Sequence, residues 1–148
     1  MSKNLIAYYS QSGKTKDLIE KLSKNTDSDV LEITVPENTF PEDMFETADV
    51  AKKQRKENNF PVLTSKIPDL NNYAAIVVAG PNWSAAVATP VISFLNQIQD
   101  FKGKVISFNT SVGQNDDQYN EDFKKVAKDL NVIATVNNDI NEVKNILE

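Results

Sequence analysis

The chain of 148 residues contains neither cysteine nor histidine. The absence of cysteine excludes disulfides, thiolate catalysis and cysteine-ligated metals or clusters. The absence of histidine removes the commonest general base and the commonest metal ligand, so no metal site is expected. Any catalysis by this chain must therefore rest on carboxylates, hydroxyls, lysines or a bound cofactor.

Long apolar runs are also absent. No stretch approaches the roughly 20 apolar residues that are needed to cross a bilayer. The apolar run between Lys3 and Ser10 is too short for the core of a signal peptide. We therefore expect a cytoplasmic protein that does not bind membranes. A net charge of −5 argues against nucleic-acid binding and favours partners with basic docking surfaces.

Two common nucleotide-binding motifs are missing. Ser12-Gly13-Lys14-Thr15 resembles the end of a Walker A motif, but Tyr8 stands where that motif needs its first glycine. The apolar stretch that ends at Gly80 also lacks the aspartate that helps to hold magnesium in many NTPases. The dinucleotide fingerprint GxGxxG does not occur. A nucleotide hydrolase is therefore not favoured.

Hydrophobic periodicity predicts strands that alternate with helices. Short, nearly unbroken apolar runs predict five buried strands, at residues 5–9, 29–35, 73–80, 104–108 and 132–136. Helical spacing predicts one helix from Gly13, one over about 42–57, and three whose apolar faces carry Val87, Val91, Phe94, Leu95 and Ile98; Phe123, Val126, Ala127 and Leu130; and Ile140, Val143, Ile146 and Leu147. Asn138 or Asp139 is the expected N-cap of the last helix. The alternation predicts a single α/β domain over residues 1–148, a doubly wound parallel sheet covered on both faces.

Polar loops follow three of the predicted strands, at Ser10–Thr15, Pro81–Ala86 and Thr110–Tyr119. In open parallel sheets, ligands bind outside the carboxyl ends of the strands. The first loop leads into a helix N-terminus, whose free N–H groups and partial positive charge favour an anion. Hydroxyls surround one glycine there, which lets the backbone approach a ligand closely. The first loop is therefore a predicted phosphate site.

Three segments in this order resemble the flavodoxin family. Ser10-Gln-Ser-Gly-Lys-Thr15 is similar to the flavodoxin phosphate loop, [ST]-x-[ST]-G-x-T. The likeness continues in Gly80-Pro-Asn-Trp83 with the Thr89–Leu95 helix, and again in residues 101–113. It covers nearly the whole chain. The resemblance implies a three-layer, five-stranded sheet in the order 2-1-3-4-5, and FMN as the cofactor.

The resemblance also assigns parts of the FMN to the three loops. The phosphate would be held by Ser10, Gln11, Ser12, Gly13, Lys14 and Thr15, although the Lys14 side chain could equally point to water. The flavin ring would lie against Pro81, Asn82, Trp83, Ser84 and Ala85, with the Trp83 indole stacked on it. The pyrimidine edge would meet Thr110, Ser111, Val112, Gly113 and Gln114. Tyr119 either covers the other flavin face or belongs to the helix core.

The implied function is that of a monomeric flavodoxin, a non-enzymatic carrier that passes single electrons between a flavodoxin-reductase-type donor and redox acceptor proteins. The alternative is an FMN-dependent NAD(P)H:quinone-type oxidoreductase, which needs an open flavin face and a nicotinamide site. Acidic residues near the third loop should disfavour the anionic reduced flavin: Asp116, Asp117, Glu121 and Asp122. The cluster Lys52, Lys53, Arg55 and Lys56 is either a docking patch or a solvated helix face.

Overall fold

Parallel strands form one sheet in the computed structural model, which describes residues 3–10, 13–41, 43–83, 86–110 and 116–147. The order is β2-β1-β3-β4-β5, which confirms the predicted topology. The strands are β1 (Lys3–Tyr8), β2 (Ser28–Glu32), β3 (Tyr73–Gly80), β4 (Lys104–Asn109) and β5 (Asn131–Asn137). Because every neighbouring pair is parallel, the carboxyl ends of all these strands lie at one edge of the sheet.

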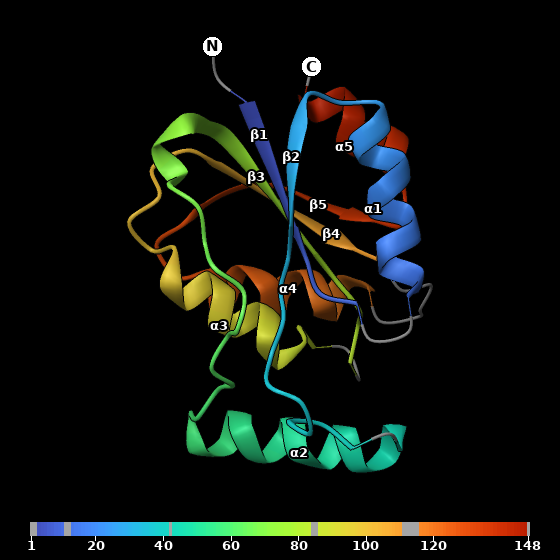
Figure 1. The fold of residues 1–148 in the computed structure, drawn as a ribbon, viewed down its shortest axis with the longest axis vertical. Helices are drawn as coiled ribbons and strands as arrows, with labels where there is room; N and C mark the ends of the chain where they lie inside the picture. Colours follow the sequence, from blue (N-terminus) through green and yellow to red (C-terminus); the bar gives the residue numbers. More distant parts are fainter. Residues whose placement is uncertain (1–2, 11–12, 42, 84–85, 111–115, 148) are drawn as a thin grey trace.

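Helices cover both faces of the sheet (Figure 1). In the described part of the chain they are α1 (Lys14–Lys24), α2 (Met44–Glu57), α3 (Thr89–Gln97), α4 (Asp116–Ala127), α5 (Ile140–Leu147) and a short 3₁₀ turn, η1 (Leu70–Asn72). α1 and α5 pack on one face, and α3 and α4 pack on the other, so the three-layer doubly wound fold is confirmed. α2 lies outside the layers, at the end of the molecule towards which β3 runs.

The core is split by the sheet into two apolar clusters, as the alternation of side chains along β3 requires. Ile76 and Val78 face the layer of α3 and α4, whereas Val77 and Ala79 face α1 and α5. All of these side chains are buried, because β3 is the central strand and a helix layer covers each of its faces. The uninterrupted apolar run in the sequence is the direct consequence of this position.

Side-chain caps fix where two of the helices begin. The Asp43 carboxylate accepts a hydrogen bond from the Phe45 N–H at 2.8 Å. Asp43 is therefore the N-cap, and α2 starts at the next residue, Met44. Asp139 accepts from the N–H groups of Asn141 and Glu142 at 3.0 and 3.2 Å. Of the two expected caps of the last helix, Asp139 is therefore the one that acts, while Asn138 has a left-handed backbone.

Several predicted boundaries differ from the structure. β1 runs over Lys3–Tyr8, so it ends one residue before the predicted Tyr9. β2 ends at Glu32, not at Val35. The Ile33 N–H still donates to the Tyr8 carbonyl at 2.7 Å, but Thr34 already binds the later connection, where its carbonyl accepts from the Thr64 N–H at 2.8 Å. Val87 precedes α3 and forms an antiparallel bridge with Asn82. Leu130 lies past the end of α4, although its side chain is buried in the predicted core.

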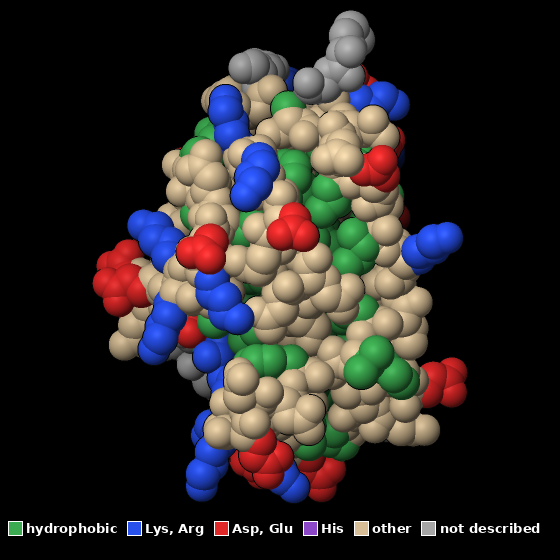
Figure 2. Space-filling model, turned by 90° about the vertical axis from the view of Figure 1, so that its left-hand side faces the viewer, with side chains coloured by type: hydrophobic (Ala, Val, Ile, Leu, Met, Phe, Trp, Pro, Cys, Tyr) green, Lys and Arg blue, Asp and Glu red, His purple; other side chains and the backbone are tan. Residues whose placement is uncertain are grey.

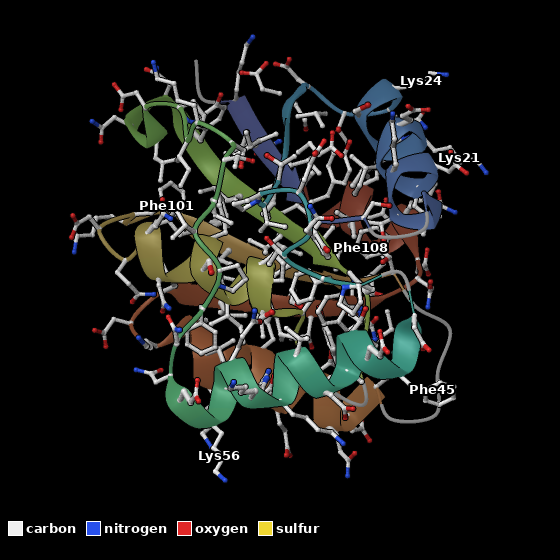
Figure 3. The ribbon with its side chains drawn as sticks, turned by 60° about the horizontal axis from the view of Figure 1, so that its bottom comes forward. Lys21, Lys24, Phe45, Lys56, Phe101 and Phe108 are labelled. Atoms are coloured by element: carbon white, nitrogen blue, oxygen red, sulfur yellow. The ribbon has the colours of Figure 1, made fainter. Side chains whose placement is uncertain are left out.

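Charged side chains of both signs are interspersed around apolar ones on the face that Figure 2 shows. Figure 3 contrasts the interior with the outer helix: Phe108 points into the core, whereas Phe45 and Lys56 project from the two ends of α2. Phe45 is 85% exposed. None of the helices in the described ranges combines the length and the apolar character that a membrane span requires.

Candidate functional site

The first predicted loop turns sharply where β1 leads into α1. Gly13 occupies the N-cap position of α1 with φ +87°, a conformation that L-residues with a side chain adopt at a cost. Its N–H donates to the Ser10 Oγ at 3.0 Å, which closes the turn. Among the described residues, no side chain caps α1, so none of them uses the first N–H groups of this helix. An exposed turn ahead of such a helix end suits an anion.

Hydroxyl groups join the first loop to the ends of two other strands. The Thr15 Oγ1 lies 2.6 Å from the Thr110 Oγ1, and Thr110 donates from that oxygen to the Gly80 carbonyl at 3.0 Å. Because the single hydroxyl proton of Thr110 is used on Gly80, Thr15 must be the donor to Thr110. The Thr15 proton is therefore committed to holding the loops together. Thr15 is 4% exposed and Thr110 1% exposed, so this chain of bonds is shielded from water.

Trp83 stands at a turn after β3. The N–H of Trp83 donates to the Ala86 carbonyl at 2.9 Å, and the N–H of Ala86 donates back to the Trp83 carbonyl at 3.1 Å. The next pair outward, Asn82 and Val87, forms the antiparallel bridge. Trp83 is half-buried, and Pro81 and Asn82 beside it are also partly exposed. The indole therefore keeps accessible surface for a ligand.

Two aromatic rings contact the Trp83 indole edge to face. Tyr9 approaches it with a centroid distance of 5.8 Å and an interplanar angle of 82°, and Phe40 with 5.2 Å and 81°. Such perpendicular contacts are a preferred aromatic geometry. Burial raises the pKa of the Tyr9 hydroxyl above its ordinary value. Sequence reasoning missed both partners: Tyr9 was assigned to a strand and Phe40 lies in the least regular stretch of the chain.

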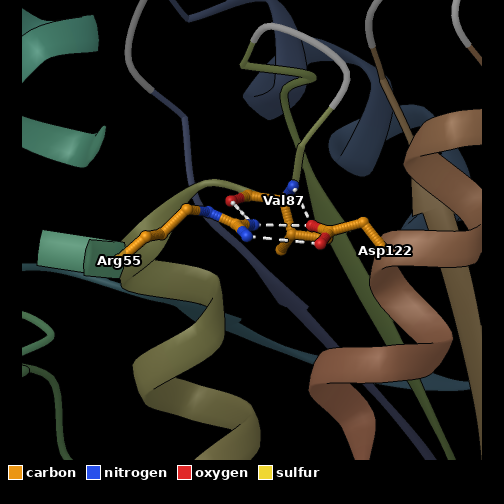
Figure 4. Close-up of polar contacts among 3 residues, drawn as sticks. All are labelled: Arg55, Val87 and Asp122. Atoms are coloured by element: carbon orange, nitrogen blue, oxygen red, sulfur yellow. Dashed lines mark hydrogen bonds and ion pairs between the residues drawn. The ribbon is translucent and has the colours of Figure 1, made fainter. Parts of the chain in front are cut away.

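A salt bridge fixes the far side of the same turn (Figure 4). Arg55 on α2 binds Asp122 on α4, with Nη2–Oδ2 at 2.6 Å and Nη1–Oδ1 at 3.2 Å. Both side chains also bind the backbone of Val87. Arg55 is thus not part of a fully solvated face, and the Asp122 carboxylate is already paired with a cation. Lys52, Lys53 and Lys56 are exposed, as both a docking patch and a solvated face require.

Polar groups at the end of β4 position the start of the third loop. The Asn109 side chain is buried, and its Nδ2 donates to the Asp116 Oδ1 at 3.0 Å and to the Asn137 Oδ1 at 3.3 Å. The main-chain carbonyl of Asn109 accepts from the Asn138 N–H at 2.8 Å. These bonds tie the carboxyl end of β4 to β5 and to the first turn of α4. Asp116 therefore has a structural role as the hydrogen-bond acceptor of Asn109, in addition to its negative charge.

Tyr119 lies in the core. Its side chain has no exposed surface and belongs to the apolar cluster under α3 and α4. Of the two roles left open by the sequence, the structure places it in the helix-core role. Its hydroxyl has no hydrogen-bond partner among the described residues. Burial, and secondarily the Asp122 carboxylate, raises the pKa of this hydroxyl well above its ordinary value.

Several predicted site residues lie outside the described residues. They are Gln11, Ser12, Ser84, Ala85, Ser111, Val112, Gly113 and Gln114, together with the side chain of Lys14. Apart from the buried Tyr119, the remaining predicted residues of the three loops lie at the carboxyl ends of the strands, where Thr15, Gly80 and Thr110 are hydrogen-bonded to one another. A cleft of about 410 Å³ opens beside Ser10, lined by Tyr9 and by residues 35–36 and 38–41 between β2 and α2.

The fold and this edge define a class: a doubly wound α/β domain whose candidate ligand site lies at the carboxyl ends of β1, β3 and β4. The family model for flavodoxins matches residues 3–145. The chain therefore belongs to the flavodoxin family. Among curated proteins, no sequence matches the chain significantly.

Solved structures agree with this assignment. A flavoprotein of Lactobacillus acidophilus NCFM, crystallised in complex with FMN, is 39% identical with a TM-score of 0.92, over 98% of both chains. The NMR structure of the apo-form of the flavoprotein from the same organism is 40% identical with a TM-score of 0.77, over 94% of this chain and 93% of that one. A protein of Bacteroides eggerthii DSM 20697 shares the fold at 22% identity, with a TM-score of 0.82 over 99% and 98% of the two chains.

Proposed function

We propose that this chain binds FMN noncovalently at the carboxyl edge of its sheet and carries single electrons between partner proteins. The observation that carries the proposal is the meeting of three loops there, joined by the bonds among Thr15, Thr110 and Gly80, with a partly exposed Trp83 three residues after Gly80. The family assignment and the FMN complex of a 39% identical relative support it. FMN supplies the redox chemistry when bound, and the protein supplies binding, orientation and tuning of the potential.

The residues present fit the parts of FMN. The phosphate would lie at the N-terminus of α1, where Gly13 leaves open space: a Cβ placed there would meet nothing within 4 Å. Backbone N–H groups of the first turn would hold it, with Ser10 beside them, because the Thr15 proton is engaged with Thr110. Gln11, Ser12 and Lys14 would complete this loop. The ring would lie against Trp83, with Pro81, Asn82, Ser84 and Ala85 around it.

The third loop would meet the pyrimidine edge of the flavin. Thr110 fixes where that loop leaves β4, because both its N–H and its hydroxyl donate to the Gly80 carbonyl, at 3.1 and 3.0 Å. Ser111, Val112, Gly113 and Gln114 would supply the contacts themselves. Because Tyr119 is fully buried, it would not cover the second flavin face.

The partners would be an electron donor of the flavodoxin-reductase type and redox acceptor proteins. Asp116, Asp117 and Glu121 at the start of α4 are acidic side chains next to the third loop, and they would favour basic docking surfaces. The proposed carrier is a cytoplasmic monomer that binds neither nucleic acid nor membranes. These assignments extend the prediction made from net charge and composition.

A second candidate function is an FMN-dependent NAD(P)H:quinone-type oxidoreductase. The cleft of about 410 Å³ beside Ser10 favours it, since this volume lies within the range of small-molecule pockets, about 300–1,000 Å³. Aromatic and hydroxyl side chains line the cleft, among them Tyr9, Thr39 and Phe40. Such a lining suits a neutral planar acceptor next to the flavin.

One experiment tests both functions. A visible spectrum of the purified protein, before and after incubation with FMN, reports the cofactor. Titration with NADPH, with and without a flavodoxin reductase, then separates a carrier from an enzyme. We expect flavin colour and reduction that depends on the reductase. A colourless protein that does not take up FMN contradicts the proposal, and rapid reduction by NADPH alone supports the enzyme instead.

A further inference from the structure

The turn that carries Trp83 is held from outside by two charged side chains. Arg55 donates from Nη2 to the Val87 carbonyl at 3.1 Å, and the Val87 N–H donates to the Asp122 Oδ2 at 2.9 Å. The two side chains close the arrangement with their own bidentate contact (Figure 4). Both polar groups of one peptide residue are therefore bound by a single ion pair, which we name the Val87 clasp: Arg55, Asp122 and Val87.

The clasp acts on Trp83 through a short antiparallel pairing. Val87 is bridged to Asn82, and the mutual hydrogen bonds of Trp83 and Ala86 lie immediately inside that bridge. Fixing the backbone of Val87 therefore fixes one side of the turn on which the indole is mounted. A small pocket of about 100 Å³, lined in part by Arg55, Trp83 and Val87, separates α2 from this turn.

The chemistry of the pair suits positioning more than stabilisation. Arg55 and Asp122 come from two different helices, α2 and α4, and both reach the backbone of Val87. Their side chains are 30% and 18% exposed. Partly buried ion pairs lose much of their Coulombic gain to desolvation, so they are weak evidence for added stability. A guanidinium, however, presents its donors in a rigid fork, which can bind a carboxylate and a carbonyl at once. A lysine has no such geometry.

We propose that Arg55 and Asp122 are positioning residues for Trp83, so that the affinity of the protein for the flavin ring depends on the clasp. The proposal rests on the proposed function. Neither side chain needs to touch the cofactor: they set the place of the turn, and the turn sets the place of the indole. The phosphate end of the ligand, at Gly13 and α1, is outside their reach.

The test uses Arg55→Met, the milder Arg55→Lys, and Asp122→Asn. Lys56→Met is the matched control, because it removes a neighbouring positive charge of α2 that is exposed. Trp83 is the only tryptophan of the chain, so the emission and anisotropy of apo-protein fluorescence report on this turn without any flavin. Far-UV circular dichroism during heating shows that each variant is folded.

We expect red-shifted emission and lower anisotropy in the clasp variants, and wild-type values for Lys56→Met. Affinity for FMN and for riboflavin should fall by the same factor, about tenfold, as expected for a charged hydrogen bond that no longer holds the ring site. The ratio of the two affinities, which measures the phosphate contribution, should stay constant. Arg55→Lys should fold like the wild type but should still show the red-shifted emission and the lower anisotropy of Trp83.

Wild-type fluorescence and wild-type riboflavin affinity in folded Arg55→Met would overturn the proposal. So would a loss of FMN affinity without a loss of riboflavin affinity, since that result would place the effect at the phosphate. If wild-type protein binds neither flavin, the proposed function fails. The apo-protein fluorescence then still decides whether the clasp positions Trp83.

Discussion

The hydroxyl oxygens of Thr15 and Thr110 lie 2.6 Å apart, although 95 residues separate them in the chain. Thr110 also binds the Gly80 carbonyl, so one hydroxyl chain ties together the ends of β1, β3 and β4. Buried hydroxyl groups thus fix the positions of the three loops of the candidate site relative to one another. The contact makes the site partly preorganised before any ligand arrives.

Thr110→Val should destabilise the protein. The substitution preserves shape but leaves the Thr15 hydroxyl without its acceptor and the Gly80 carbonyl with one bond fewer, at an expected cost of about 1–3 kcal/mol in the free energy of unfolding. Urea denaturation measures it. Thr64→Val is the matched control, because it removes an exposed hydroxyl that pairs with Thr34 at 2.7 Å. Equal, small effects of both substitutions would contradict a role for the buried contact.

Gly13→Ala should separate conformational strain from steric clash. With φ +87° and no atom within 4 Å of the added Cβ, the cost is the left-handed backbone alone, roughly 1–2 kcal/mol. FMN affinity should fall with it, because relaxing the turn moves the N–H groups of α1. Isothermal titration calorimetry and urea denaturation measure the two effects.

Gly103→Ala provides the contrast to Gly13→Ala. A Cβ there would lie 2.6 Å from the Ala74 carbonyl oxygen and 2.5 Å from the Phe101 ring. Gly103→Ala should lower the free energy of unfolding by more than Gly13→Ala. FMN affinity of the folded protein should be unchanged, because Gly103 lies at the amino end of β4, away from the candidate site. Undiminished FMN binding by Gly13→Ala would remove the first loop from the phosphate site.

Tyr119→Phe should maintain or raise stability, by up to about 1 kcal/mol, because the deleted hydroxyl is buried without a described partner. It should also change the pH dependence. The pKa of Tyr119 is raised in the folded protein, so stability is retained below the unfolded pKa of about 10 and falls as the pH rises above it.

Thermal unfolding between pH 8 and 11 tests both parts of the Tyr119 prediction. The variant should lose less stability than wild type over the alkaline range. Tyr73→Phe serves as the comparison: it removes a hydroxyl that donates to the Asp29 carboxylate at 2.8 Å. Partial burial and this bond also raise the pKa of Tyr73, so the variant should reduce the alkaline loss as well, but by less than Tyr119→Phe because Tyr73 is only partly buried. Strong destabilisation by Tyr119→Phe would mean that its hydroxyl has a partner in solution.

Neutralising acidic residues near the third loop should raise the second reduction potential of the bound flavin. Asp117→Asn with Glu121→Gln removes negative charge that disfavours the anionic reduced form, and a tenfold shift of a one-electron equilibrium corresponds to about 59 mV. Reduction by a basic reductase should slow as well. Spectroelectrochemistry and stopped-flow kinetics measure the two effects.

Asp122 is excluded from the set of acidic residues expected to tune the potential, because Arg55 neutralises it. Asp116 is better left intact, since it also accepts a bond from Asn109. If the potential and the rate are unchanged in the double variant, the remaining acidic side chains act only as the polar start of α4.

The sequence predicted those parts of the fold that depend on local pattern. β3 was found to the residue, because a central strand buried on both faces shows an unbroken apolar run. β2 is an edge strand, so no such run marked its end, and the chain beyond Glu32 follows a contact with Thr64 that only the tertiary structure contains.

The candidate site also has parts that the sequence predicted and parts that it did not. The loop of Ser10 and Gly13 was recognisable because its motif is continuous in sequence. The clasp was not, because Arg55 sits in a cluster of charges that resembles a solvated face, and its partner lies 67 residues away. The role of Tyr119 was left undecided because aromatic residues suit both a helix core and a flavin face, and only its burial separates the two.

β2 leaves one edge of the sheet open, and Val30 on it is 47% exposed. Asp29 and Glu32 lie on the same short strand, both of them exposed. An edge with free backbone groups is a template for a further strand, and like charges on both chains oppose that addition. The carboxylates of β2 would therefore oppose pairing of this edge with a second copy. Replacing both by threonine should increase aggregation, measured by thioflavin T fluorescence, without changing FMN affinity.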